Sequence, residues 1–84
     1  MEKLSDLPNI GKELERQLNE IDVKTFDQLK SLGAEKAWLK IRALDSSACI
    51  HRLYALEGAI CGVKKSLLPQ DRKAELKLFY SQNK

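Results

Sequence analysis

The sequence has few of the residues on which most enzymes and metal proteins depend. It contains one histidine, His51, and two cysteines among 84 residues. Cys49 lies two residues before His51 and so on a different side of a helix, and no carboxylate pair stands at metal-ligand spacing. The four glycines are widely separated, which excludes a glycine-rich nucleotide loop. We therefore expect no enzymatic activity, no catalytic residue, no cofactor and no metal site.

Long apolar runs are also absent. No stretch approaches the roughly 18–20 apolar residues of a membrane-spanning helix, and the N-terminal segment MEKLSDL lacks the apolar region of a signal peptide. Cys49 and Cys61 fall on one expected helix, about 18 Å apart, which is too far for a disulfide. Their apolar neighbours predict buried thiols. Together these observations predict a cytoplasmic protein with no membrane partner.

The remaining composition is that of one small globular domain spanning residues 1–84. Hydrophobic residues make up 43% and charged residues 32% of the chain, which is typical of a folded protein. Aromatic residues make up only 6%, so the core must be mainly aliphatic. A chain of this length buries about 60–65% of its unfolded surface, which leaves little room for an enclosed substrate cavity.

Helical periodicity runs through nearly the whole sequence, and no segment favours a strand. Apolar residues recur at spacings of three and four, as on one face of a helix. Thr25 is a predicted helix N-cap, and Gly33 is predicted to end the same helix. Asp45 or Ser46 is predicted to cap a later helix. Leu44 is expected to be buried, and the terminal segment SQNK is expected to fray. The prediction is an all-α fold, a small bundle of about five helices of the helix-hairpin-helix or SAM-like kind, with helices at 10–20, 26–32, 34–44, 47–62 and 69–80.

The segment LPNIG, residues 7–11, precedes the first long helix and has two interpretations. In one it is an ordinary helix start, with Asn9 as the cap. In the other it resembles the turn of a helix-hairpin-helix, whose exposed amides meet a nucleic-acid phosphate. Asn9 stands where that turn usually has glycine, and asparagine tolerates left-handed backbone. The candidate nucleic-acid-binding residues are Asn9, Ile10, Gly11, Lys12 and Arg16.

The charge is unevenly distributed along the chain. The net charge is +3, with eight Lys/Arg and nine Asp/Glu in residues 1–45 but seven Lys/Arg and three Asp/Glu in residues 46–84. LPNIG therefore belongs to the acidic half, which argues against tight DNA binding there. A second basic group is either a binding stripe or a solvated face, and we favour the solvated face. Its members are Arg52, Lys64, Lys65, Arg72, Lys73 and Lys77.

Four segments in order resemble the C-terminal domain of the TfoX/Sxy family of DNA-transformation (competence) proteins. They are LSDLPNIGKELERQL, TFDQLKSLGAEKAWLKIRAL, LYALEGAICG and LPQDRKAELKLFY. The resemblance implies an all-helical, non-enzymatic domain linked to competence regulation, in a family whose members act as transcriptional co-activators with a cAMP receptor protein. Larger members carry a separate N-terminal domain, which these 84 residues do not include. Asp22 stands where the family leads us to expect glycine.

Two functions remain open from the sequence. The first is weak, sequence-independent DNA binding to the phosphate backbone through LPNIG. The second is a protein–protein interaction module that docks on a transcription factor or polymerase, or that self-associates through the apolar stripe from Cys49 to Val63. The expected oligomeric state is a monomer or a weak homodimer.

Overall fold

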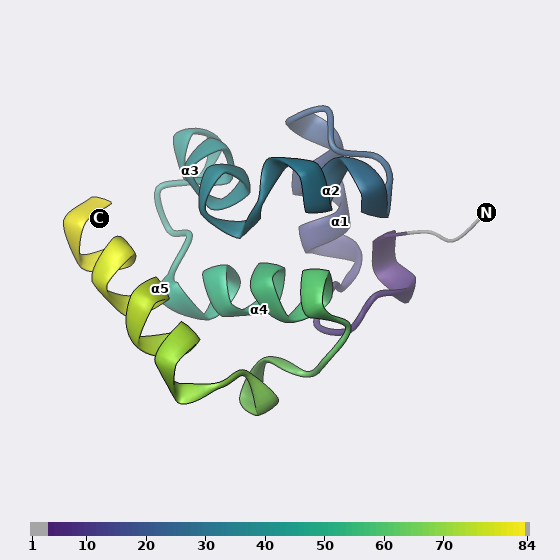
Figure 1. The fold of residues 1–84 in the computed structure, drawn as a ribbon. Helices are drawn as coiled ribbons and strands as arrows, with labels where there is room; N and C mark the ends of the chain where they lie inside the picture. Colours follow the sequence, from purple (N-terminus) through teal and green to yellow (C-terminus); the bar gives the residue numbers. More distant parts are fainter. Residues whose placement is uncertain (1–3, 84) are drawn as a thin grey trace.

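The computed structural model describes residues 4–83, and every regular element in this range is helical (Figure 1). The all-α prediction is confirmed, including its five α-helices. Two short 3-10 helices complete the order of elements. The elements are η1 (Leu4–Asp6), α1 (Lys12–Glu20), α2 (Phe26–Leu32), α3 (Ala34–Leu44), α4 (Ile50–Cys61), η2 (Lys65–Leu67) and α5 (Gln70–Asn83).

Helix α4 is the centre of the bundle. It contacts α2, α3, α5 and η2, and Figure 1 shows it crossing the middle of the molecule between α3 and the α4–α5 connection. Its buried residues are Leu53, Ala55, Leu56, Gly58 and Ala59, so small side chains let neighbouring segments approach closely.

The prediction of two buried cysteines is wrong, because both thiols are exposed. Cys61 lies outside the arc of α4 that faces the core. Cys49 precedes the first turn as the N-cap residue of α4. The Cys61 thiol donates a hydrogen bond to Glu57 Oε2 (3.5 Å), and partial burial together with that carboxylate raises its pKa.

Trp38 joins α3 to α4 and α5. Its side chain is fully buried, and its indole N–H donates to the Cys49 carbonyl oxygen at 3.2 Å. Phe79 and Tyr80 of α5 meet the ring edge-on, with centroids 6.0 and 5.4 Å away. Arg42 covers the same ring at 5.4 Å and donates to the Asn83 carbonyl oxygen. These contacts hold the C-terminal helix against the bundle.

Several predictions at the ends of helices are wrong. Residues 81–83 were expected to fray but are helical, because Arg42 satisfies the Asn83 carbonyl; Lys84 lies outside the described residues. Leu44 was expected in the core but is 56% exposed at the end of α3. Neither Asp45 nor Ser46 caps α4, whose N-cap is Cys49. In contrast, α2 has its predicted bounds, and Thr25 caps it in a capping box with Gln28.

Helix α1 ends in a left-handed turn with an unusual residue. The Val23 amide donates to the Leu18 carbonyl and the Asp22 amide to the Asn19 carbonyl, the two bonds of a Schellman motif. Asp22 has a φ of 66°, in the region that favours glycine, and Gly62 occupies the matching position after α4. The glycine expected at residue 22 therefore has a structural reason, and aspartate fills the position under strain.

We expect Asp22→Gly to stabilise the fold by about 0.5–1 kcal/mol. The substitution relieves the left-handed strain and removes a negative charge from a helix C-terminus. The thermal midpoint should rise by about 2–6 °C in a melt followed by circular dichroism. Asp22→Asn removes the charge but keeps the side chain, and so separates the two causes. A lower midpoint for Asp22→Gly would contradict the assignment of strain.

Candidate nucleic-acid interface

The LPNIG turn reverses the chain between η1 and α1. The Leu7 amide donates to the Leu4 carbonyl and the Ile10 amide to the Leu7 carbonyl, and Asn9 has a φ of 69°. The expectation that asparagine supports a left-handed turn here is confirmed. Ile10 is 5% exposed and belongs to the core, so its side chain is not available to a ligand. Its amide is also occupied by the turn.

The N-terminus of α1 is open to solvent. The helix begins at Lys12, and its N-cap residue is Gly11, which makes no side-chain capping bond. A Cβ built on Gly11 would meet nothing within 4 Å, and Gly11, Lys12 and Glu13 are all exposed. The amides of a first helical turn have no partner within the helix. Those at Lys12 and Glu13 are therefore accessible to an anion from outside.

Asn9 does not cap α1, which corrects that interpretation of LPNIG. Its Nδ2 donates to the Val63 carbonyl oxygen at 2.9 Å, and its Oδ1 accepts from the Lys65 amide at 3.0 Å. The carboxamide thus bridges the turn to the connector that follows α4. Gly58 lies directly beneath, where a Cβ would overlap Asn9 Nδ2 and come within 2.8 Å of the Val63 carbonyl oxygen. We call this arrangement of Asn9, Gly58, Val63 and Lys65 the Asn9 bridge.

The Asn9 bridge brings Lys64 and Lys65 beside LPNIG. The turn and the connector together line a shallow groove of about 830 Å³, with both lysines exposed at its edge. Asp6 also lines it and contributes a negative charge. Lys64 and Lys65, from the basic half of the chain, therefore lie beside the LPNIG turn of the acidic half. We call the surface formed by Gly11, Lys12, Lys64 and Lys65 the turn–connector surface.

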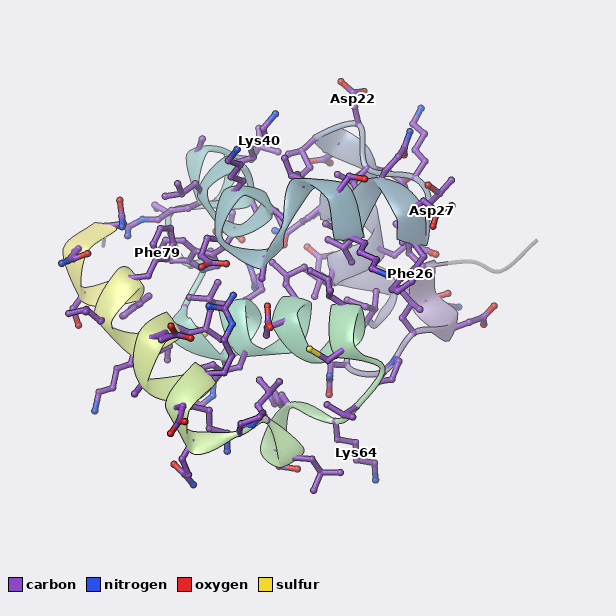
Figure 2. The ribbon with its side chains drawn as sticks, viewed as in Figure 1. Asp22, Phe26, Asp27, Lys40, Lys64 and Phe79 are labelled. Carbon is purple, nitrogen blue, oxygen red and sulfur yellow. The ribbon has the colours of Figure 1, made fainter. Side chains whose placement is uncertain are left out.

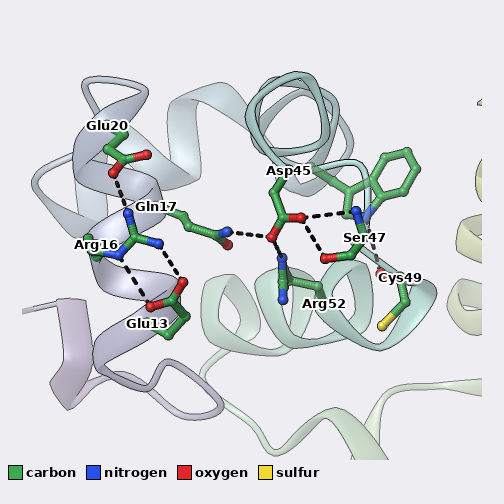
Figure 3. Close-up of polar contacts among 9 residues, drawn as sticks. Glu13, Arg16, Gln17, Glu20, Asp45, Ser47, Cys49 and Arg52 are labelled. Atoms are coloured by element: carbon green, nitrogen blue, oxygen red, sulfur yellow. Dashed lines mark hydrogen bonds and ion pairs between the residues drawn. The ribbon is translucent and has the colours of Figure 1, made fainter.

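Arg16 is less available than Lys12. Its guanidinium pairs with Glu13 and Glu20 on the same helix, and all three side chains are largely exposed (Figure 3). The hydrogen bond from Arg16 lowers the pKa of Glu13 and raises that of Arg16, so these charges persist together near neutral pH. The two carboxylates and the one guanidinium together carry a net charge of −1. A phosphate near α1 would therefore be attracted mainly by Lys12.

Arg52, a member of the second basic group, is also engaged. Its guanidinium pairs with Asp45 at 3.1 Å, and the same carboxylate accepts from Ser47 and from Gln17 Nε2 (Figure 3). Hydrogen bonds from Ser47 and then Arg52 hold the pKa of Asp45 well below its usual range. Asp45 thereby ties α1 and α4 to the turn after α3.

Arg72 is a structural residue of the bundle. Its guanidinium bonds to Glu57 of α4 at 3.0 Å and to Glu35 of α3 at 2.9 Å, while Glu75 lies one turn further along α5. The hydrogen bond from Arg72 lowers the pKa of Glu57, and the same bond raises the pKa of Arg72. Since its fork is occupied by carboxylates, Arg72 is not free to bind a nucleic-acid phosphate.

The last two basic candidates lie on α5. Lys73 Nζ donates to the Ser66 carbonyl oxygen at 3.3 Å, which places Lys73 next to η2. Lys77 is exposed one turn further on. The six members of the second basic group therefore separate into two partnered arginines and four lysines, of which Lys64 and Lys65 lie at the turn.

Residues 4–83 include neither a metal-binding cluster nor a membrane-spanning helix. No group of three or more His, Cys, Asp or Glu side chains in this range is arranged to hold a metal ion. Within the same residues, no helix is long and apolar enough to cross a membrane.

A second groove, of about 560 Å³, lies between the α1–α2 connector, α2 and α3.

Comparison with known proteins identifies a family that matches most of this chain. The family described as the TfoX C-terminal domain matches residues 1–80. Protein Sxy of Escherichia coli (strain K12) is 41% identical over 75 residues, which cover 89% of this chain. The chain spans only 36% of the length of that relative.

Solved structures share the same fold. An uncharacterized protein from Listeria monocytogenes, in a triclinic crystal form, is 46% identical and superposes with a TM-score of 0.95, over 96% of this chain and 92% of that one. A protein of unknown function from the same organism, in a tetragonal form, is also 46% identical, with a TM-score of 0.94 over 96% and 99% of the two chains.

Proposed function

This chain belongs to the TfoX C-terminal domain family, and from that membership we propose that it is a non-enzymatic regulatory domain related to competence regulation. In this proposal it binds the phosphate backbone of nucleic acid weakly and without sequence preference. The binding site is the turn–connector surface. The observation that carries the proposal is the Asn9 bridge, because it ties the connector that bears Lys64 and Lys65 to the turn that leads into α1.

The chemistry of this surface suits a phosphate. Uncapped amides at the start of α1 offer hydrogen-bond donors at the positive end of the helix dipole. Lys12 in the first turn of α1, and Lys64 and Lys65 on the connector, supply three exposed ammonium groups. The four residues of the turn–connector surface include no aromatic side chain and no arginine that could recognise a base with two hydrogen bonds. Contact with the phosphate backbone is therefore favoured over base readout.

The same surface limits the affinity. Glu13 stands in the first turn of α1 as an ionised carboxylate, and Asp6 lines the groove. Three lysines that each neutralise one phosphate give a slope of log K against log salt of about −2 to −3. Such binding weakens steeply between about 50 mM and 200 mM salt. It suits an accessory domain that assists a partner more than one that finds a site alone.

Charge reversal at the connector tests the proposal. In the double variant Lys64→Glu, Lys65→Glu, we expect binding of a short random duplex at about 50 mM salt to weaken by about tenfold or more. The salt slope should become shallower by about two, because two phosphate contacts are lost. Fluorescence anisotropy with a labelled duplex measures both quantities.

A matched control is the double variant Lys36→Glu, Lys40→Glu, which changes the net charge equally on α3. Both lysines are exposed, and Figure 2 shows Lys40 on the other side of the molecule from Lys64. This control should lose only a small, long-range part of the affinity. Equal losses of affinity in the two double variants would show that the effect comes from the change in net charge alone. Absence of binding by the wild type at about 50 mM salt would contradict the proposal and favour a protein partner.

A further inference from the structure

The most exposed of the large apolar side chains in residues 4–83 lies beside the basic connector. Leu67 of η2 is 67% exposed, and Lys64 and Lys65 precede it by three and two residues. Neither lysine has a carboxylate partner among the ion pairs of the described chain. The segment 64–67 is therefore an apolar projection flanked by positive charge. We call it the Leu67 projection.

A groove of complementary character lies on the other side of the molecule. Its apolar lining comes from Ile21, Val23 and Leu32, and two exposed carboxylates, Asp22 and Asp27, stand at its edge. Lys40 is the one basic residue that lines it. Figure 2 shows Asp22 and Lys40 at the opposite side of the view from Lys64. We call this the α1–α2 groove.

We propose that the α1–α2 groove receives the Leu67 projection of a second copy of this chain. Leu67 would bury its side chain against the apolar lining, and Lys64 and Lys65 would face Asp22 and Asp27 of the other copy. Because the two surfaces lie on different sides, each copy offers one projection and one groove, and the contact is head-to-tail. Association then proceeds through dimers to longer chains as the concentration rises.

This inference does not depend on nucleic-acid binding, although Lys64 and Lys65 serve in both. Its test uses the chain alone, in sedimentation velocity from about 10 μM to 1 mM at about 50 mM salt. The weight-average mass of the wild type should rise continuously with concentration and fall at about 500 mM salt, because screening weakens the charge pairs. A constant monomer mass across this range overturns the proposal.

Leucine substitutions test the apolar half of the contact. Leu67→Ser should raise the concentration needed for half-association by about tenfold or more, since a buried leucine is lost from the contact. Leu78→Ser is the matched control, because Leu78 is 60% exposed on α5 and lies outside both surfaces. Equal effects of the two substitutions, or a larger effect at Leu78, overturn the assignment.

Charge reversal tests the pairing itself. Two double variants are needed, one with Asp22→Lys and Asp27→Lys in the groove and one with Lys64→Asp and Lys65→Asp in the projection. Each should remain monomeric alone, because like charges then meet at the contact. Mixed in equal amounts they should associate, since the basic groove of one accepts the acidic projection of the other. Circular dichroism of each variant checks that the fold is retained. Failure of the folded mixture to associate overturns the proposed pairing.

Discussion

Trp38→Ala should lower the free energy of unfolding by about 3–5 kcal/mol, the largest loss expected from any single substitution considered. The side chain is fully buried and contacts two aromatic rings of α5. Its removal leaves a cavity where α3, α4 and α5 meet and removes the indole donor to the Cys49 carbonyl, which still accepts from the Arg52 and Leu53 amides. Since small domains are stabilised by only about 5–15 kcal/mol, much of the stability would be lost.

Urea denaturation followed by far-ultraviolet circular dichroism measures this loss, because the variant lacks the only tryptophan of the chain. Trp38→Phe keeps most of the apolar volume but loses the indole N–H, so it should cost only about 1–2 kcal/mol. Leu44→Ala should change the stability by less than about 0.5 kcal/mol, since Leu44 is 56% exposed. Equal effects of Trp38→Ala and Leu44→Ala would contradict the described core.

Gly58→Ala should destabilise the protein by about 2–3 kcal/mol, although alanine is the better helix former by about 1 kcal/mol. The added methyl would overlap the Asn9 side chain and approach the Val63 carbonyl oxygen to 2.8 Å. The backbone contact cannot be relieved by rotating a side chain, so α4 and its connector must separate. Both hydrogen bonds of the Asn9 bridge would weaken, at about 1 kcal/mol each.

A double-mutant cycle with Asn9→Gly isolates the contact. Glycine keeps the left-handed backbone at residue 9 but removes the carboxamide that overlaps the new methyl. The cost of Gly58→Ala in urea denaturation should therefore be smaller by about 1 kcal/mol or more in the Asn9→Gly background. If Gly58→Ala instead stabilises the wild type by about 1 kcal/mol, helix propensity outweighs packing and the Asn9 bridge is not as described.

Local sequence patterns predicted the helices well because each pattern reports a local cause. The α2 helix has its predicted bounds, since Thr25 and Gln28 form a capping box within four residues. Trp38 and Leu76 stand at apolar positions of the helical periodicity and are fully buried. Predictions failed at the start of α4 and at the end of α5, and at the end of α5 a distant partner contributes. Arg42, far from Asn83 in sequence, keeps the last turn of α5 helical.

The candidate site could be predicted only in part. Helical periodicity and turn chemistry identified LPNIG, and its left-handed Asn9 is present. Nothing local indicates that Asn9 bonds to residues 54 and 56 positions away, and so the nearness of Lys64 and Lys65 was missed. Likewise, composition counts Arg72 as a basic surface residue, whereas the fold pairs it with Glu35 and Glu57. Charge along a chain does not specify which charges meet.

The most direct measurement of the central proposal is an amide NMR titration of the wild-type chain with a short random duplex. Binding at the turn–connector surface predicts that Gly11, Lys12, Lys64 and Lys65 shift together with one shared dissociation constant. These shifts should fade between about 50 mM and 200 mM salt. Shifts confined to Lys73 and Lys77 of α5, or no shifts at either salt concentration, would contradict it and leave LPNIG with the structural role of the Asn9 bridge alone.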